Sequence, residues 1–496
     1  MNVLRERPAG YARLVHKYSV RAPALLNSSL IADISARRKA ILGRVVEETF
    51  PERYAPDDTD FDHLVFALKY DGVDLVILKR LFQNFDRREL ERRITAQPTS
   101  KYARRIFFLF EFLTGERLAL DDLTKGPYCH VLEPDAYFVS TGRPVPRHRV
   151  YDNLLGDAGF CPVVRQTPLL TAAGGKDLGA RAHEIISAVD PVLLTRAISY
   201  LYTKETRSSF AIEREEVEPG ERMERFIGQL ATAGTLPLER EIELTELQNA
   251  FVDPRYAERG FRRAGDLEVY VGETLGFQER VHHVGARSAS TPEIMAAWAR
   301  MRTVEGPGGP VVEAACRAFS FVFIHPFGDG NGRIHRLLLH SVLARRNYLP
   351  PRLVVPISAV ILADPNGYDR ALESFSARAL PLIKFKLDEA GELSILNDTD
   401  DLYRYPDLTV VSEATFGWLE RAIETDLVTE LDFLRRFDEI RARMRKIVEM
   451  PDRKEQAFIK LCLANGNKLA ARKRDHFAEL DDATIAALEA VFLDVR

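Results

Sequence analysis

The strongest apolar pattern in the chain covers residues 311–324, where nearly every side of the predicted helix is hydrophobic. This pattern is typical of a helix buried in the middle of a bundle. Amphipathic patterns with helical spacing recur through much of the remaining sequence and predict further helices. These cover residues 29–50, 61–82 (one or two short helices), 102–113, 191–212, 244–250, 292–301, 368–379, 415–447 and 483–493.

Two short β-like runs, at residues 267–271 and 280–284, are separated by Gly272 and Gly276 and predict one hairpin. The predicted fold class is therefore mainly α, with a helical core that carries a small β-hairpin flap. Mostly helical N-terminal and C-terminal domains flank this core.

Breaks in the pattern divide the chain into three regions. Residues 1–169 form a mostly helical N-terminal region without an assigned function, and a proline-rich stretch at 127–168 is irregular or a short hairpin. Residues 171–179 are interpreted as a flexible linker. The core, residues 180–390, opens where Asp190 can cap a helix and Pro191 can occupy its first position. A polar acidic boundary precedes the C-terminal helical domain, residues 404–496.

The composition is that of an ordinary water-soluble protein: 496 residues, 46% hydrophobic, with a formal net charge of −4. No apolar run approaches the roughly 20 residues of a membrane-spanning helix, and the first residues lack the apolar centre of a signal peptide. The four cysteines are scattered without CxxC spacing, which favours a reducing compartment over a disulfide framework. We therefore expect a cytoplasmic protein without a membrane partner.

The candidate chemistry lies in the twelve residues 325–336, His-Pro-Phe-Gly-Asp-Gly-Asn-Gly-Arg-Ile-His-Arg. Pro326 disfavours helical angles at His325, so the buried helix should end there with the imidazole ring turned into the following loop. Gly328, Gly330 and Gly332 alternate with Asp329 and Asn331. Such a loop can turn several backbone N–H groups into one hollow, which suits an anion.

Helical spacing resumes after Gly332, so the loop leads directly to a helix N-terminus that favours phosphate. Arg333 and Arg336 are three residues apart and share one helix face. A base, a carboxylate, an amide nest and two guanidinium groups together indicate a nucleotide-handling site. The alternative is a glycine-rich turn beside a buried histidine. The spacing fits neither an EF-hand nor a Walker loop, and zinc would lack a third ligand.

These twelve residues resemble the signature of the Fic family, His-x-Phe-x-Asp/Glu-Gly-Asn-Gly-Arg-x-x-Arg, and they match it at every specified position. The resemblance implies an all-helical core that transfers AMP from ATP, with Mg²⁺ as cofactor, to a hydroxyl group of a target protein. It implies the following roles: His325 as general base, Phe327 as a buried anchor, Asp329 as the Mg²⁺ ligand, Gly328, Gly330, Asn331 and Gly332 as the phosphate cradle, and Arg333 and Arg336 as partners of the β- and γ-phosphates.

A second stretch, residues 209–213, has a predicted function only because this motif is present. Ser209 and Glu213 resemble the family's inhibitory motif Ser/Thr-x-x-x-Glu-Gly/Asn, whereas Arg214 departs from it. A glutamate that reaches Arg336 would occupy the place of the γ-phosphate, so ATP would bind unproductively. Without the resemblance, Glu213 is an exposed helix residue next to Glu215 and Glu216.

The resemblance also implies that the hairpin is a flap that aligns the target by main-chain pairing. The candidate docking residues are Val269, Tyr270, Val271, Val281, His282 and His283. Adjacent strand residues face opposite sides, so at most one of the two histidines can point inward. Tyr368 is a candidate for the wall of the nucleotide pocket, and its alternative is a core aromatic.

Several alternatives remain open on the sequence alone. The same core could transfer another nucleotide-derived group or remove AMP. A regulator from a different class would sense nucleotides while its flanking helices bind DNA or protein. Clustered basic residues in both flanks permit DNA binding, although a solvated face is the favoured interpretation of those in the N-terminal region. A homodimer is possible, and no residue identifies the target.

Overall fold

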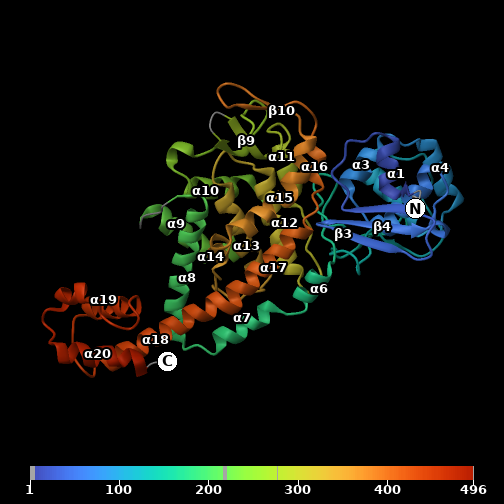
Figure 1. Cartoon of the computed structure of the whole chain (residues 1–496). Helices are drawn as coiled ribbons and strands as arrows, with labels where there is room; N and C mark the ends of the chain where they lie inside the picture. Colours follow the sequence, from blue (N-terminus) through green and yellow to red (C-terminus); the bar gives the residue numbers. More distant parts are fainter. Residues whose placement is uncertain (1–5, 216–219, 276–277, 495–496) are drawn as a thin grey trace, which may run out of the picture.

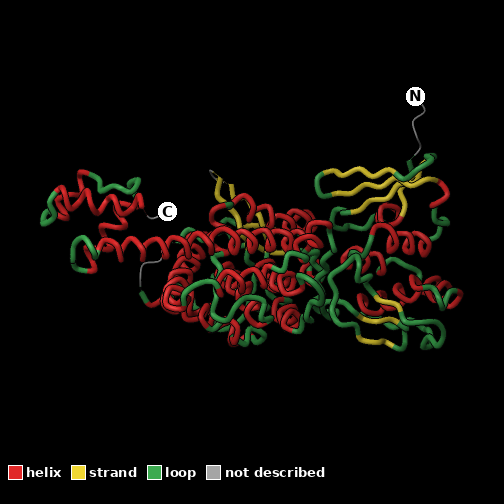
Figure 2. The backbone as a smooth tube through the Cα atoms, turned by 90° about the horizontal axis from the view of Figure 1, so that it is seen from below, coloured by secondary structure: helices red, strands yellow, loops and turns green. Residues whose placement is uncertain are grey.

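The computed structural model describes residues 6–215, 220–275 and 278–494 of the protein (Figure 1). It is mainly helical, as predicted, and its strands lie in the N-terminal part and in small hairpins (Figure 2). The N-terminal part packs on one side of the helical core, and helices α19 (Asp452–Leu463) and α20 (Asp482–Asp494) extend from the other side (Figure 1). Among the described residues, no helix has the length and apolar character needed to span a bilayer.

The helix predicted over residues 29–50 is wrong. This segment forms β2 (Asn27–Ala32), β3 (Arg38–Leu42) and β4 (Val45–Pro51), which join β1 (Arg7–Ala9) in a sheet of order β1-β2-β4-β3. The left-handed Gly43, at φ +64°, begins the two-residue turn between β3 and β4. Strands β2 and β4 run parallel. The N-terminal region is therefore mixed rather than mostly helical.

The other N-terminal predictions agree better with the structure. The aromatic-rich core helix is α5 (Lys101–Thr114), and the segment before it contains α1 (Gly10–Lys17), α2 (Asp60–Phe66), α3 (Leu75–Phe82) and α4 (Arg87–Ala96). The proline-rich stretch forms a small sheet of order β5-β7-β6 from β5 (Cys129–His130), β6 (Arg143–Val145) and β7 (Val150–Asp152). The expected linker is instead largely helical, because α6 (Pro168–Gly174) and α7 (Leu178–Ser187) fill most of it.

The core consists of helices wrapped around one buried helix, α12 (Gly309–Ile324). All of its side chains except Pro310 and Val322 are buried, as the apolar pattern predicted. The remaining elements of the core are α8 (Pro191–Ile212), α9 (Glu221–Ala231), α10 (Glu241–Phe251), β8 (Tyr270–Leu275), β9 (Gln278–Val284), α11 (Thr291–Ala299), α13 (Asn331–Arg345), α14 (Ile357–Ala363), α15 (Pro365–Ala379), β10 (Phe385–Leu387), β11 (Leu393–Ile395) and α16 (Asp400–Arg404).

Residues 404–496 do not pack as one domain. Helix α17 (Thr409–Arg421) packs against α12 and α15 in the main core, and it continues through a π-helical stretch, Ala422–Leu427, into α18 (Val428–Met444). A separate small hydrophobic core begins at Phe437 and includes α19 and α20. The C-terminal unit is thus shorter than predicted, and one long helix joins it to the core (Figure 1).

Helix α8 begins as predicted, with the Asp190 carboxylate accepting hydrogen bonds from the amides of Val192 and Leu193. It is fastened to the core by Glu205, which is 1% exposed. The Glu205 carboxylate lies 2.9 Å from Nε2 of His340 on α13 and accepts the Ser358 amide of α14 at 2.9 Å. One buried carboxylate therefore joins three helices.

Replacing Glu205 with Ala should lower the free energy of unfolding by about 3–5 kcal/mol, because buried polar groups on α13 and α14 would lose their acceptor. Calorimetry and urea unfolding measure this change. The control is Glu184→Ala, since the Glu184 side chain is 70% exposed and pairs only at the surface with Arg181. Equal stability of the two variants would show that Glu205 is not the fastening residue.

Candidate active site

The end of α12 sets the position of the candidate base. His325 follows the last helical residue and has φ +56° and ψ 62°, a left-handed conformation that is uncommon outside glycine. Its own amide still donates to the Phe321 carbonyl at 2.9 Å. The helix therefore ends where the sequence predicted, but Nδ1 of the ring faces back to the last turn of the helix.

Hydrogen bonding selects the tautomer of His325. Nδ1 lies 3.0 Å from the Val322 carbonyl, which can only accept, so Nδ1 carries the proton. Nε2 then keeps a lone pair. Burial, with a smaller contribution from the nearby Arg262, lowers the pKa of His325 from 6.5 to about 4. The ring is thus neutral near pH 7, as a general base must be.

Arg262 is a functional candidate that the sequence did not reveal. Its guanidinium donates to the carbonyls of His325 at 2.9 Å, Ala286 at 2.8 Å and Ile324 at 3.3 Å. Glu268 lies 3.3 Å from the same group and also accepts the Ser288 amide. Because helix-end carbonyls lack intrahelical partners, Arg262 satisfies the end of α12 and fixes the turn at His325.

The loop after His325 closes on itself through Asn331. The Asn331 side chain accepts the Phe327 amide at 3.1 Å and donates to the Phe327 carbonyl at 2.8 Å. The Phe327 ring is fully buried against Phe261. The buried anchor is therefore in place, whereas the side chain of Asn331 faces the loop's own backbone.

Two of the predicted phosphate amides already have partners. The Gly328 amide donates to Glu258 at 2.5 Å, and the Gly330 amide donates to Oδ1 of Asp329 at 2.5 Å. Gly330 is left-handed, at φ +85°, and a Cβ there would lie 3.0 Å from Val252, so the turn requires glycine. The amides at the start of α13, at Asn331, Gly332 and Arg333, remain the donors for an anion because a helix leaves its first amides unpaired.

Arg336 is 1% exposed and is held by both residues of the second sequence motif. Its Nε donates to Oγ of Ser209 at 2.8 Å, and its Nη2 donates to the Ser209 carbonyl at 2.7 Å. Nη2 also donates to Oε1 of Glu213 at 2.8 Å. The structure therefore brings Glu213 to the arginine that the sequence proposed for it, and Ser209 binds the same arginine.

The carboxylate of Glu213 lies directly above Gly332 in the first turn of α13. A Cβ on Gly332 would lie 2.1 Å from Oε1 of Glu213, so any other residue there would push this carboxylate out of its present place. The positive end of the α13 dipole and the Arg336 guanidinium meet at this point. An oxyanion from the protein thus occupies a place where a phosphate would be stabilised by the same groups.

Arg333 is equally buried. Its guanidinium donates to the Phe251 carbonyl at 3.0 Å and to Oδ1 of Asp329 at 3.1 Å. Nε of Arg333 and Nη1 of Arg336 are buried and have no acceptor among the described residues. Buried donors of this kind are rare, so two of them at one helix start indicate room for a further acceptor.

The C-terminus of α8 explains how Arg214 is accommodated. The amide of Glu215 donates to the Phe210 carbonyl at 3.1 Å, and the amide of Arg214 donates to the Ala211 carbonyl at 3.0 Å. Between them, Arg214 is left-handed, at φ +58°. This is the Schellman capping geometry, which glycine and asparagine adopt more readily than arginine.

The flap forms as a hairpin of β8 and β9, in which Tyr270 pairs with Val284 and Val271 pairs with His283. Val269 precedes β8 and accepts the Gly285 amide, and Val281 pairs with Gly272. One histidine points inward, as expected. His283 lies 3.0 Å from Ser376 Oγ and 6.2 Å, between ring centroids, from His325, whereas the His282 side chain is 40% exposed beside Glu273. The predicted hairpin turn at Gly276 lies outside the described residues.

Tyr368 is a neighbour of Arg336 and is 8% exposed. Its ring packs against His335 and Trp418, at centroid distances of 6.1 and 5.9 Å. Burial raises the pKa of Tyr368 to about 12. This is the position of a core aromatic, which was the alternative interpretation of this residue.

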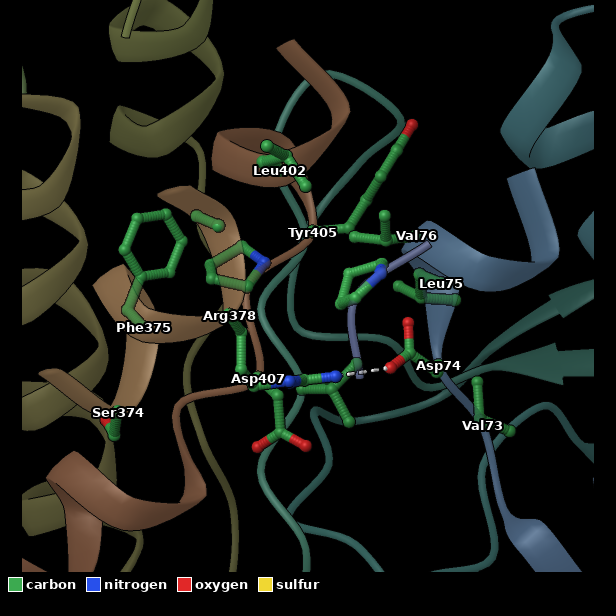
Figure 3. A pocket seen from close by; sticks show the side chains of 14 residues that line it. Val73, Asp74, Leu75, Val76, Ser374, Phe375, Arg378, Leu402, Tyr405 and Asp407 are labelled. Carbon is green, nitrogen blue, oxygen red and sulfur yellow. Dashed lines mark hydrogen bonds and ion pairs between the residues drawn. The ribbon is translucent and has the colours of Figure 1, made fainter. Parts of the chain in front are cut away.

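Figure 3 shows a small pocket between the N-terminal part and the core. Arg378 of α15 points toward Asp74 in this pocket, and the two form an ion pair of 3.1 Å. Tyr405 and Phe375 also line it, but no residue of the 325–336 loop does. The pocket is separate from the candidate active site.

Comparison with known proteins matches residues 240–343 to the family described as Fic/DOC. Two proteins named "Protein adenylyltransferase Fic", from Aedes aegypti and Culex quinquefasciatus, are each 51% identical over 41 residues. Each match spans 8% of this chain and 8% of the relative.

Two solved structures are also similar. A Fic family protein from Desulfovibrio desulfuricans is 21% identical, with a TM-score of 0.40, over 63% of this chain and 87% of its own. A Fic domain containing signaling protein from Bacteroides thetaiotaomicron is 17% identical, with a TM-score of 0.35, over 54% and 97%.

The capping turn leads to a prediction about Arg214. A non-glycine residue in the left-handed conformation destabilises the fold by about 1–2 kcal/mol. Glycine avoids this cost, but it loses more chain entropy on folding, which offsets about 0.5–1 kcal/mol of the gain. Arg214→Gly should therefore slow hydrogen exchange of the Glu215 amide about 2–5-fold. Arg214→Val, whose branched side chain tolerates this conformation poorly, should accelerate that exchange. Equal exchange in both variants would contradict the strained-cap explanation.

Proposed function

Because residues 240–343 make this chain a member of the Fic/DOC family, we propose that it is a protein adenylyltransferase. It transfers AMP from Mg²⁺·ATP to a hydroxyl group of a target protein, and Glu213 holds it in an inhibited state. The observation that carries the proposal is the pair of buried guanidinium groups, Arg333 and Arg336, at the start of α13. Each keeps a nitrogen without an acceptor among the described residues.

These groups suit a triphosphate better than a neutral ligand. Two buried cations three residues apart, next to the first amides of a helix, attract an extended anion with several charged oxygens. A merely nucleotide-sensing site would need no base, yet the neutral imidazole of His325 stands at the end of the preceding helix. This favours a transferase over a sensor.

The reaction follows from these positions. Nε2 of His325 accepts the proton of the target hydroxyl while the hydroxyl oxygen attacks the α-phosphorus. The new oxygen–phosphorus bond forms as the bond from the α-phosphorus to the bridging oxygen breaks, and pyrophosphate leaves with that electron pair. Arg333 and Arg336 stabilise the charge that develops on the pyrophosphate. The chain thus supplies the base, the orientation and the charge compensation.

Asp329 is the residue that would hold Mg²⁺. Its side chain is 49% exposed, and both of its hydrogen bonds are made by Oδ1, so Oδ2 can bind a metal. Mg²⁺ commonly binds one or two protein carboxylates together with substrate phosphates and water, and one carboxylate therefore fits. When bound, Mg²⁺ supplies further neutralisation of the phosphate charge.

Inhibition follows from the contact of Glu213 with Arg336. The carboxylate takes up one guanidinium donor and places a negative charge above Gly332. A γ-phosphate at this point would meet both steric overlap and charge repulsion. ATP must therefore displace Glu213 or bind in a pose that does not present its α-phosphorus to the hydroxyl.

The first test compares ATP labelled at the α-phosphate with ATP labelled at the γ-phosphate. We expect protein labelling from the α-label alone. His325→Ala should reduce this labelling by about 10²–10⁴-fold, because the base is lost, while ATP binding remains. His183→Ala, at an exposed site on α7, is the control. Labelling by γ-phosphate would indicate a kinase instead, and full α-labelling by His325→Ala would remove the base assignment.

The second test concerns Glu213. Glu213→Gly should raise automodification about 10-fold or more, since a charge-assisted contact to buried Arg336 is removed, although partial exposure of Glu213 weakens it. Gel-based α-label incorporation measures the change. Glu213→Gln should raise it less, because the amide still accepts a hydrogen bond from Arg336. Unchanged or lower activity in both variants would exclude Glu213 from a regulatory role.

A further inference from the structure

The capping turn at the end of α8 carries two carboxylates, and each contacts a different arginine of α13. Glu213 is the last residue of the helical turn, Arg214 is left-handed, and Glu215 follows. Hydrogen bonds from the amides of Glu213 and Glu215 to the Phe210 carbonyl, at 3.0 and 3.1 Å, fold this tripeptide back on α8. The reversal turns both side chains toward α13.

Glu215 lies against Arg333. Its carboxylate is 3.1 Å from Nη1 of Arg333, whose side chain is 1% exposed. It is also 2.8 Å from Nη2 of Arg222 on α9. The Arg333 guanidinium also packs over the Phe210 ring of α8, 5.3 Å from its centroid. Glu215 is therefore held by two arginines and, with its side chain 35% exposed, is the partner of a buried cation at the edge of the site.

Arg333 links Glu215 to the metal-binding candidate. Its other donors reach the Phe251 carbonyl at 3.0 Å and Oδ1 of Asp329 at 3.1 Å. While Glu215 and Asp329 neutralise Arg333, this guanidinium has little positive charge left for a phosphate. Nε of Arg333 stays without an acceptor among the described residues, so the present contacts do not saturate it.

We propose that Glu215 is a second inhibitory carboxylate, which competes with a phosphate group of the nucleotide for Arg333 as Glu213 competes for Arg336. The inference rests on the proposed function, because it assigns the same phosphate-binding arginines. A ligand with at least two adjacent phosphates must then displace two carboxylates on one turn of chain. Release of either contact disturbs the shared capping turn, so the two contacts are coupled.

The test uses four variants of the full chain: Glu213→Gly, Glu215→Gln, Glu213→Gly with Glu215→Gln, and Glu213→Gly with Glu224→Gln. Glu224 is an exposed residue of α9, and Glu224→Gln removes one negative charge from the same region. Circular dichroism confirms folding of each protein. Titration calorimetry with Mg²⁺·ATP measures binding, and α-label incorporation measures transfer.

We expect Glu213→Gly/Glu215→Gln to bind Mg²⁺·ATP about 10-fold more tightly than Glu213→Gly, because a charge-assisted contact to a buried guanidinium is removed. The Glu224→Gln control should match Glu213→Gly. Binding that is unchanged, weaker or equal to the control would overturn the role of Glu215.

The two proposals fail differently. If Glu213→Gly/Glu215→Gln binds the nucleotide more tightly but no variant transfers the α-label, the role of Glu215 is supported and the proposed adenylyl transfer is refuted. If Glu213→Gly transfers the label and Glu215→Gln adds nothing, the transferase stands and the second carboxylate is refuted. If no variant binds the nucleotide, both proposals fall.

Discussion

Two guanidinium groups buried at the start of one helix impose the main constraint on this structure. A buried cation is costly unless it is paired, and neither Arg333 nor Arg336 can reach solvent. Each is compensated by carboxylates and backbone carbonyls from segments distant in sequence, so α8 and the end of α10 must lie close to the 325–336 loop. The contacts that compensate these two cations are therefore the ones that a phosphate ligand would have to replace.

The candidate base is stabilised in a different way from the two arginines. His325 is kept neutral by burial, and it is oriented by backbone carbonyl groups and by Arg262 rather than by a carboxylate partner. Arg262 also donates to the carbonyls of Ile324 and Ala286, and His283 of the flap packs beside the ring. The base is thus rigid, whereas the phosphate side depends on ion pairs that a ligand can exchange.

The local features of the site were predictable because neighbouring residues determine them. The end of α12 at His325, the loop glycines and the restart of the helix follow from proline, glycine and apolar spacing. Arg262 and Glu258 were missed because their partners are backbone groups about 60–70 residues away, which no local pattern records.

The N-terminal sheet was missed for a related reason. Its parallel pairing of β2 with β4 is a long-range contact, and apolar residues such as Ile31 and Phe50 fit either helical or strand spacing. The length of the C-terminal unit was overestimated because an amphipathic pattern does not reveal which partner covers its apolar face, and α17 is covered by the core.

The unbroken helix from Thr409 to Met444 has a geometric consequence of its own. It also lies along α8, where Arg196 meets Asp438 at 2.6 Å and Lys204 meets Glu430 at 2.5 Å. In a continuous helix each residue adds about 1.5 Å of length and about 100° of rotation. The number of residues in this helix therefore determines the direction in which α19 and α20 extend from the core. The extra residue that a π-helical turn accommodates, at Ala422–Leu427, therefore decides which side of the C-terminal unit faces outward.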